Sequence, residues 1–251
     1  MRTLTGSFIK QARAEGFRFS SYTEVGCQLL IGLEKADKIS GQTEPGCDAN
    51  VQTQRLEWIN SHGPSTVVLG GRLPLILHGD RFDNREGGYE GDYSDYFRLP
   101  GTAEYDAERL SREITESYRQ TVQLLLEHGH QVVLVYPIPE VGWHVPNMLA
   151  RRTLLNGLKW PIPDPLTTSY AVFLERTASS YALLDSFKGE AIIRVYPEAL
   201  FCNVEETGRC SAHSDDEIFY ADEHHPSLAG AQIIVGQIIL ELSINSLPTA
   251  G

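Results

Sequence analysis

The chain has 251 residues, with 33 acidic against 21 basic side chains and a formal net charge of −12. This excess of acid repels phosphate backbones, so we exclude nucleic acid as a partner, and for the chain as a whole it disfavours anionic membrane surfaces. Its contents of 41% apolar and 22% charged residues are ordinary for globular proteins. No apolar run reaches the roughly 18 to 20 residues that span a bilayer. The first residues lack the pattern of an export signal. We expect a soluble single domain over residues 1–251.

Helical and extended patterns alternate along the chain. Short runs of β-branched and aromatic residues predict strands at 17–22, 66–70, 131–136 and 191–196. Apolar residues at helical spacing predict helices at about 3–15, 102–128, 167–181 and 227–242. Because the middle two strand runs are almost wholly apolar and helices separate them, the pattern indicates an α/β fold with a doubly wound parallel sheet.

Two stretches break this alternation. Residues 78–101 are rich in Gly, Asp and Tyr without apolar periodicity, which favours an irregular surface insertion loop; a sugar-binding loop is the alternative. Residues 137–146, PIPEVGWHVP, directly follow the 131–136 strand. In open α/β sheets the ligand crevice lies at the carboxyl ends of the strands, so this second stretch is a candidate wall of a site.

The four cysteines form two local pairs, Cys27 with Cys47 and Cys202 with Cys210, and neither pair has Cys-x-x-Cys spacing. The spacing leaves two interpretations open, short disulfides or four free buried thiols. Disulfides would indicate an oxidising compartment, which contrasts with the missing export signal.

The segment FYADEHHPSLAGA at 219–231 carries the most informative chemistry. Asp222 precedes His225 by three residues just before a predicted helix, so the carboxylate can reach Nδ1 of the imidazole. Such a carboxylate fixes the tautomer and leaves Nε2 to deprotonate a hydroxyl. A helix cap or surface pair is the simpler interpretation of this spacing. A zinc site including His213 and His224 is a further alternative, but no helical His-x-x-x-His or cysteine ligand supports it, so we expect no metal and no cofactor.

The pattern Tyr220-x-Asp222-x-x-His225-x-Ser227-x-x-Gly230-Ala231 resembles the last motif of SGNH hydrolases. More narrowly, it is similar to the SGNH domain fused to acyltransferase-3 membrane proteins, which O-acylate cell-surface polysaccharides. The order of other features agrees with this resemblance: Cys27, Cys47, TVVLGGR, PIPE, Cys202 and Cys210. The resemblance implies a flavodoxin-like three-layer fold and a Ser-His-Asp triad containing His225 and Asp222. It also implies disulfides, a polysaccharide acyl acceptor, an extracytoplasmic (periplasmic) location and an upstream acyltransferase membrane domain.

The nucleophile of that family is not found. Its Gly-Asp-Ser-His block ends the first strand, yet here Gly79-Asp80 is followed by arginine and Gly91-Asp92 by tyrosine. Ser7 follows Gly6 but falls inside the predicted first helix, which indicates a structural role. We therefore expect the first strand to be missing, Met1 to be an internal methionine, the serine to lie upstream of it, and the chain as given to be inactive. A non-catalytic carbohydrate-binding module is the alternative.

The remaining candidate residues follow from the resemblance and from position. Gly26, Gly70 and Gly71 are candidates for donating backbone N–H groups to an oxyanion, although they could equally serve only as turn residues. Arg72 and His144 are candidates for lining the substrate site, with surface exposure or packing as the alternative.

Overall fold

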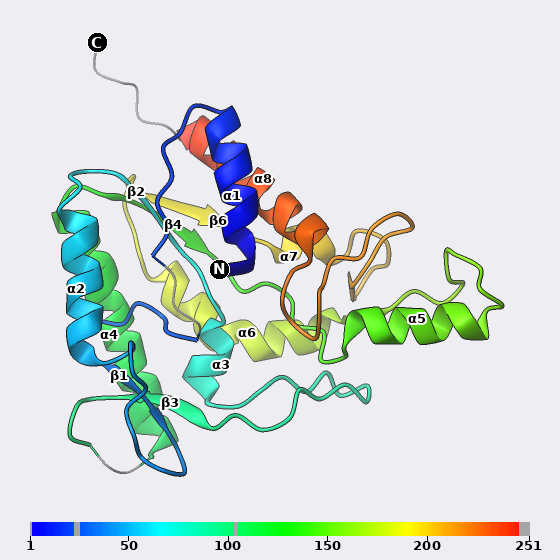
Figure 1. Ribbon diagram of the computed structural model, residues 1–251, viewed down its shortest axis with the longest axis horizontal. Coiled ribbons are helices and arrows are strands. Elements are labelled where there is room, and N and C mark those ends of the chain that lie inside the picture. The colour runs from blue at the N-terminus through cyan, green and yellow to red at the C-terminus, as the bar shows by residue number, and fades with distance from the viewer. Residues whose placement is uncertain (1, 23–25, 103–104, 246–251) are drawn as a thin grey trace.

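The computed structural model describes residues 2–22, 26–102 and 105–245 (Figure 1). Its central sheet contains β2 (Thr66–Leu69), β4 (Gln131–Val135) and β6 (Ile192–Val195), parallel and in the order β2-β4-β6. Thr66 aligns with Gln131, and Val132 aligns with Ile192. Three of the four predicted strands are therefore confirmed, and β4, which lies in the middle, packs apolar side chains on both faces.

Helices cover both faces of this sheet. One face packs against α2 (Ala49–Asn60), α3 (Leu73–His78), α4 (Ala107–Glu127) and α6 (Tyr170–Asp185). The other face packs against α1 (Arg2–Ala14) and α8 (Leu228–Asn245), which also contact each other. Alternate residues of β4 divide between the two cores, Val132 and Leu134 to the first and Val133 and Val135 to the second. The result is the three-layer α/β arrangement that the alternating pattern predicts.

In two of these helices, α4 and α8, the apolar positions in the sequence can be compared with the residues that are buried. The apolar positions of α4 are fully buried, as helical periodicity predicts, and they are Leu110, Ile114, Tyr118, Val122 and Leu125. Helix α8 is long and apolar enough to cross a membrane, judged by length and composition alone. The sequence-based expectation that no segment meets this criterion is therefore wrong for α8. In this fold its Ala231, Ile234 and Ile238 are buried against the sheet and α1.

The predicted strand at 17–22 is wrong, because these residues form no ladder with any described residue. Phe17 closes the end of α1 by donating its N–H to the carbonyl of Ala12, at 2.8 Å. Phe19 stacks on Phe8, with ring centroids 5.2 Å apart. Phe19 thus packs back on the first helix, whereas Tyr22 packs against Trp58 of α2, with ring centroids 5.6 Å apart.

Residues 78–101 are less irregular than expected, because they contain strand β3 (Asp95–Arg98). It pairs antiparallel with β1 (Glu34–Asp37), and Glu34 aligns with Arg98. The side chains of this aligned pair form an ion pair at 2.9 Å. The sequence EKAD carries too many charges to be recognised as a strand. Its Glu34 is neutralised by the distant Arg98, and its Lys35 forms ion pairs with Glu44 and Asp95.

The part of the chain between β4 and α8 contains the remaining elements, which are α5 (Val145–Leu155), β5 (Thr167–Ser169), α7 (Glu198–Phe201) and β7 (Arg209–Ser211). Strands β5 and β7 pair antiparallel, and Ser169 then caps α6, so the helix expected at 167–181 starts at Tyr170. Helix α5 reaches away from the sheet (Figure 1).

Both cysteine pairs form disulfides, Cys27–Cys47 and Cys202–Cys210, which decides the question that spacing left open. The first disulfide ties the segment before β1 to the residue preceding the N-cap of α2. The second joins the end of α7 to β7.

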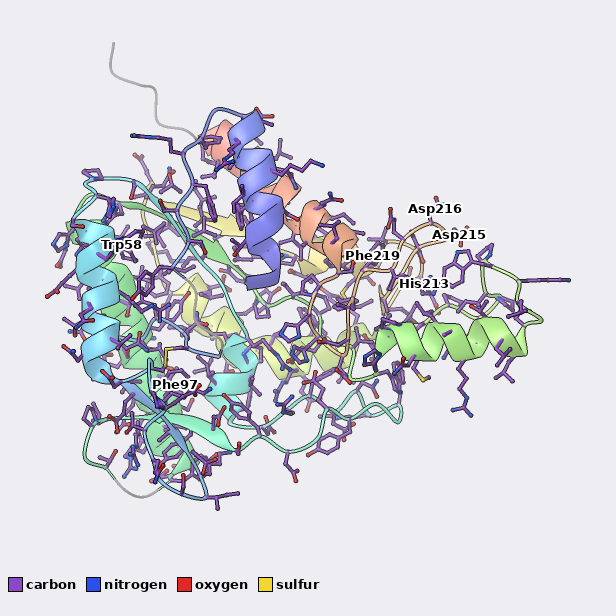
Figure 2. The ribbon with its side chains drawn as sticks, viewed as in Figure 1. Trp58, Phe97, His213, Asp215, Asp216 and Phe219 are labelled. Carbon is purple, nitrogen blue, oxygen red and sulfur yellow. A yellow bond between two sulfur atoms is a disulfide. The ribbon has the colours of Figure 1, made fainter. Side chains whose placement is uncertain are left out.

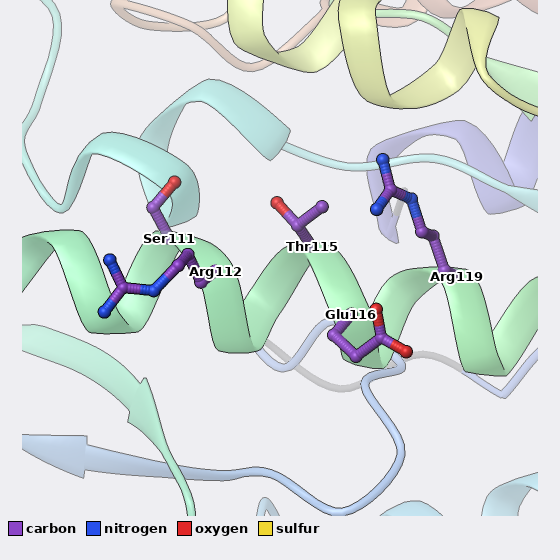
Figure 3. Close-up of a pocket in the computed structure, with 5 residues that line it drawn as sticks. All are labelled: Ser111, Arg112, Thr115, Glu116 and Arg119. Carbon is purple, nitrogen blue, oxygen red and sulfur yellow. The ribbon is translucent and has the colours of Figure 1, made fainter.

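A shallow pocket on the outer face of α4 is lined by Ser111, Arg112, Thr115, Glu116 and Arg119 (Figure 3). It shares no residue with the site described next.

Candidate functional site

The loop before α8 is held in one conformation by its own hydrogen bonds. Ala221 N–H donates to the carbonyl of His225 at 2.8 Å, and Ser227 N–H donates to that of Phe219 at 2.8 Å. Ser227 also accepts the N–H of Gly230 on its hydroxyl, which caps the first turn of α8. A Cβ on Gly230 would lie 2.2 Å from the carbonyl oxygen of Phe219, so only glycine fits there. These contacts explain the serine and glycine of the motif structurally.

Asp222 and His225 meet inside this loop. Nδ1 of His225 lies 2.6 Å from Oδ2 of Asp222, while Oδ1 accepts the N–H groups of His224 (2.9 Å) and His225 (2.7 Å). Partial burial alone would raise the pKa of Asp222, but these three hydrogen bonds lower it to about 2. The carboxylate is therefore ionised, and Nδ1 of His225 carries the donated proton.

The ring of His225 is accessible from outside. Its side chain is 52% exposed, and no described residue hydrogen bonds to its Nε2. An imidazole held through Nδ1 by a carboxylate, with Nε2 free, has the arrangement of a general base that removes a proton from a hydroxyl.

The stretch 137–146, which follows β4, contacts this loop through several hydrogen bonds. Tyr220 donates its hydroxyl to the carbonyl of Pro139 at 2.8 Å. The N–H of Val141 donates to the backbone carbonyl of Glu223 at 3.0 Å, and the N–H of Val145 donates to the backbone carbonyl of Asp222 at 3.3 Å. The Asp222–His225 pair therefore lies at the carboxyl end of the central strand, where open α/β sheets place their ligands.

A group of partly buried charged side chains lies beside the loop. Arg72, which follows β2, donates from Nη2 to Glu90 at 2.6 Å and from Nε to Glu140 at 2.9 Å. Arg176 of α6 donates from Nε to the other oxygen of Glu140 at 3.3 Å and also pairs with Asp80. Arg72 thus joins the end of β2 to two other segments. Glu90, Glu140 and Arg176 were not recognised from the sequence, because their partners lie far away along the chain.

Glu90 reaches the histidine next to the base. Its Oε2 lies 3.4 Å from Nδ1 of His224, and its side chain is only 1% exposed. Burial raises the pKa of Glu90 to about 7, despite the opposing charge of Arg72, and burial lowers the pKa of His224 to about 3. His224 is therefore neutral at physiological pH, and its contact with Glu90 is not an ion pair. Oε1 of Glu90 and Nδ1 of His224 are both buried without a hydrogen-bond partner among the described residues.

The predicted oxyanion glycines are in two places. Gly70 and Gly71 directly follow β2, next to Arg72, and a Cβ on Gly71 would lie 2.1 Å from Oε1 of Gln28. Gly26 has φ +64°, and a Cβ there would lie 2.9 Å from Nζ of Lys35. The left-handed backbone thus already favours glycine at 26, whereas a side chain at 71 would displace the end of the Gln28 side chain. Their role as oxyanion donors remains a prediction.

Two other predicted or alternative residues, His144 and His213, have structural partners. His144 caps α5, where its Nδ1 accepts the N–H of Asn147 at 3.4 Å. Both ring nitrogens of His213 are occupied, Nε2 by the N–H of Leu166 and Nδ1 by the carbonyl of Ser214. His213 therefore cannot join a zinc site. Asp222, His224 and His225 offer three ligand atoms within 4.8 Å of one another, but the carboxylate already accepts three hydrogen bonds.

Among the described residues, no serine, threonine or cysteine side chain is hydrogen bonded to His225. Ser7 lies inside α1, as the sequence predicts, and its buried hydroxyl has no hydrogen-bond partner among them.

Comparisons with known proteins agree with one another on this chain. A family model described as the SGNH domain fused to AT3 domains matches residues 1–239. The periplasmic domain of a lipopolysaccharide acetyltransferase from Salmonella ser. Paratyphi A has a similar fold, with a TM-score of 0.57 and 12% identity. The alignment covers 96% of this chain and 77% of that one. No curated protein matches this sequence.

Proposed function

Because the chain belongs to the family of SGNH domains that are fused to AT3 domains, we propose that it takes part in acyl-ester chemistry on cell-surface polysaccharide. The reaction is transfer of an O-acetyl group to a sugar hydroxyl, or hydrolysis of such an ester, outside the cytoplasm. The observation that carries this proposal is the Asp222–His225 pair with its accessible Nε2. The two disulfides support an oxidising compartment.

In the proposed reaction His225 moves one proton at each step. Nε2 takes the proton of a serine hydroxyl while the serine Oγ forms a bond to the acyl carbonyl carbon, and Asp222 stabilises the imidazolium. The bond to the donor oxygen then breaks, and that oxygen takes the proton from Nε2. In the second half a sugar hydroxyl attacks the acyl-serine, passes its proton to Nε2, and the serine oxygen takes it back on release. Water in place of the sugar gives hydrolysis.

We place the serine on a strand beside β2 that is not among these 251 residues. Among the described residues β2 pairs with β4 only, so its other edge carries unpaired backbone groups. Parallel strands are normally buried on both sides, which favours a further strand there. The sequence contains no Gly-Asp-Ser. On this proposal the 251-residue chain alone has no triad turnover.

The glycines after β2 complete the proposed site. Backbone N–H groups of Gly70 and Gly71 would donate to the oxyanion at this end of the sheet, with Gly26 as a third candidate. Arg72 positions the turn after β2 through Glu90 and Glu140, and its remaining exposed edge, with His144, would contact the substrate.

The coding sequence upstream of the Met1 codon tests the location of the serine. We expect an in-frame Gly-Asp-Ser-His after an apolar strand. In the product that contains it, His225→Ala and Asp222→Asn should each lower acetyl transfer to polysaccharide at least about a thousandfold, because the base loses its role or its tautomer. His62→Ala, an exposed histidine just after α2, is the control and should keep full activity. Retained turnover in both site variants would reject the triad.

An in-frame stop codon before Met1 would instead favour the non-catalytic carbohydrate-binding module. The 251-residue chain should then bind the polysaccharide in calorimetry without releasing acetate.

The Asp222–His225 pair can also be tested without a nucleophile. In ¹⁵N NMR spectra of the 251-residue chain, His225 should be protonated on Nδ1, and Asp222→Asn should shift it towards the Nε2-protonated tautomer. An unchanged tautomer in this variant would show that Asp222 does not orient the ring.

A further inference from the structure

Helix α5 and the turn after it form an arm, here called the α5 arm, which comprises residues 145–163. In Figure 1 the helix reaches away from the sheet and its covering helices. Its root has a small core of its own, which includes Val145, Leu149 and Ile162. With 11 residues in α5, the arm carries its far end about 16 Å from its root.

The far end of the arm is covered with large apolar side chains. Leu154 is 65% exposed, Leu155 78%, Leu158 75% and Trp160 40%. We call these four residues the apolar tip. Single exposed leucines are common on proteins, but four large apolar side chains within seven residues at the end of a projecting element indicate an interaction site.

The backbone conformation at Leu158 supports the view that these exposed side chains form an interaction site. Leu158 has φ +62°, in the left-handed region where residues with a Cβ are disfavoured and glycine or asparagine fits best. The preceding residue, Gly157, has a similar φ of +67°. A leucine is therefore held in an unfavourable backbone conformation at a place where its side chain gains no burial within the domain.

The charge of the arm is opposite to that of the whole chain. Residues 145–163 contain Arg151, Arg152 and Lys159 and no Asp or Glu, whereas the chain carries −12. Arg151 and Lys159 are exposed, and Arg152 pairs with Asp164 at 3.2 Å.

Besides Asp164, two further acidic residues near the arm belong to a different loop. Asp215 and Asp216 lie above α5 in Figure 2, and the indole N–H of Trp160 donates to the carbonyl of Asp215. This contact fixes the ring of Trp160 at the tip.

We propose that the apolar tip inserts into the headgroup region of an anionic phospholipid bilayer. Leucine and tryptophan side chains partition into this region, and each nearby basic side chain adds electrostatic attraction to acidic lipids. A narrow projecting end suits insertion between lipids better than a flat face would, and the acidic body is repelled by the same surface, so the orientation is fixed. The proposal does not depend on the acyl chemistry proposed above.

This orientation has a consequence for the candidate site. Val145, at the root of α5, donates its N–H to the carbonyl of Asp222. A tip inserted in lipid would thus hold the Asp222–His225 pair about one helix length, roughly 16 Å, from the membrane surface.

Flotation of the 251-residue chain with lipid vesicles tests the proposal. The chain should float with vesicles of phosphatidylethanolamine and phosphatidylglycerol and much less with vesicles of phosphatidylcholine alone. The triple variant Leu154→Ser, Leu155→Ser, Leu158→Ser should bind at least about tenfold more weakly, and Arg151→Gln and Lys159→Gln about fivefold more weakly each. The double variant Leu174→Ser, Leu240→Ser, which removes two exposed leucines outside the arm, is the control and should bind like the wild type.

Fluorescence gives an independent reading of insertion. Tryptophan emission should shift to the blue when acidic vesicles are added, and Trp160→Phe should abolish the shift while Trp58→Phe preserves it. The altered leucines are exposed, so circular dichroism and melting of the triple variant should match the wild type.

Equal vesicle binding by the wild type and the triple variant, or no binding by either, would overturn the proposal. Self-association in analytical ultracentrifugation that the triple variant abolishes, without vesicle binding, would assign the tip to a second copy of this chain and overturn it as well.

Discussion

At the scale of single residues, Asp222 has two tasks that one carboxylate can perform together. Oδ1 closes the loop by accepting two backbone N–H groups, and Oδ2 accepts from the ring of His225. The same hydrogen bonds that shape the loop keep the carboxylate ionised. Shape and chemistry of the proposed base are therefore set by one side chain.

Arg72 and Glu90 support the candidate site from beside it, by holding the neighbouring turn and loop. Position after β2 suggested that Arg72 contacts substrate, but two carboxylates already bind its Nε and Nη2. Its clearest role is to hold the turn after β2 against Glu90 and Glu140. Glu90 in turn lies beside His224, so these charges support the loop that carries His225.

We predict that Glu90→Gln stabilises the protein increasingly as pH rises. The folded pKa of Glu90 is about 7, above its ordinary value of 4.5, so between these pH values ionisation favours the unfolded chain, and the penalty is complete above about pH 7. Glutamine escapes this penalty. The difference in unfolding free energy, variant minus wild type, should rise by on the order of 2 kcal/mol from pH 5 to pH 8 in urea titrations.

Glu57→Gln, at an exposed position of α2, serves as the matched control for the substitution itself. A flat difference for Glu90→Gln would mean that Glu90 ionises as freely in the folded chain as in the unfolded one.

At the scale of elements, apolar packing holds some segments in place and disulfides hold others. Helices α4 and α8 are fixed by apolar faces on the two sides of the sheet. The segment before β1 has little regular structure, and the Cys27–Cys47 disulfide attaches it near the start of α2. Arg55 of α2 adds a hydrogen bond to the carbonyl of Cys27, at 3.1 Å.

We predict that removing this disulfide lowers the unfolding free energy measurably. The bond closes a loop of 20 residues, and loop entropy alone assigns it about 3 kcal/mol. The double variant Cys27→Ser, Cys47→Ser should lose about that amount in denaturant unfolding under oxidising conditions. Cys202→Ser, Cys210→Ser, which opens a loop of eight, should lose slightly less.

Adding reductant separates the two bonds. It should destabilise each double variant only by the contribution of the disulfide that remains. Unfolding curves of the wild type that do not respond to reductant would contradict a stabilising role for either bond.

At the scale of the whole molecule, the sheet has a central strand, β4, and two edge strands, β6 and β2, of which β2 leads into Gly70 and Gly71. β4 has hydrogen-bonded neighbours on both sides, whereas β2 has a partner on one side among the described residues. Both faces of the sheet are nevertheless covered by helices. This combination supports the proposed additional strand, because an edge between two covered faces leaves backbone groups without partners.

Hydrogen exchange should report the β2 edge. In the 251-residue chain we expect the amides of β4 to be strongly protected, and the β2 amides that point away from β4 to exchange much faster. Exchange measured by NMR on a product that includes the residues upstream of Met1 should show these same β2 amides slowed to the level of β4. Equal protection of β2 and β4 without those residues would argue against a missing neighbour.

Sequence alone determined the features that depend on neighbours along the chain. The apolar run of β4 and the periodicity of α4 predicted a buried parallel strand and a long covering helix, because burial of those faces is encoded within each element. Asp222 and His225 could be paired because three residues separate them in one loop. The resemblance based on these motifs is confirmed by the family match.

Tertiary structure alone decided the features that depend on distant partners. Phe19 packs on α1, Glu34 of the charged strand β1 pairs with Arg98, and Arg72 binds carboxylates 18 and 68 residues away. The exposure of the apolar tip likewise depends on where α5 projects. Hydrogen-bond and charge partners of this kind are selected by the packing of the whole chain, so no local pattern in the sequence contains them.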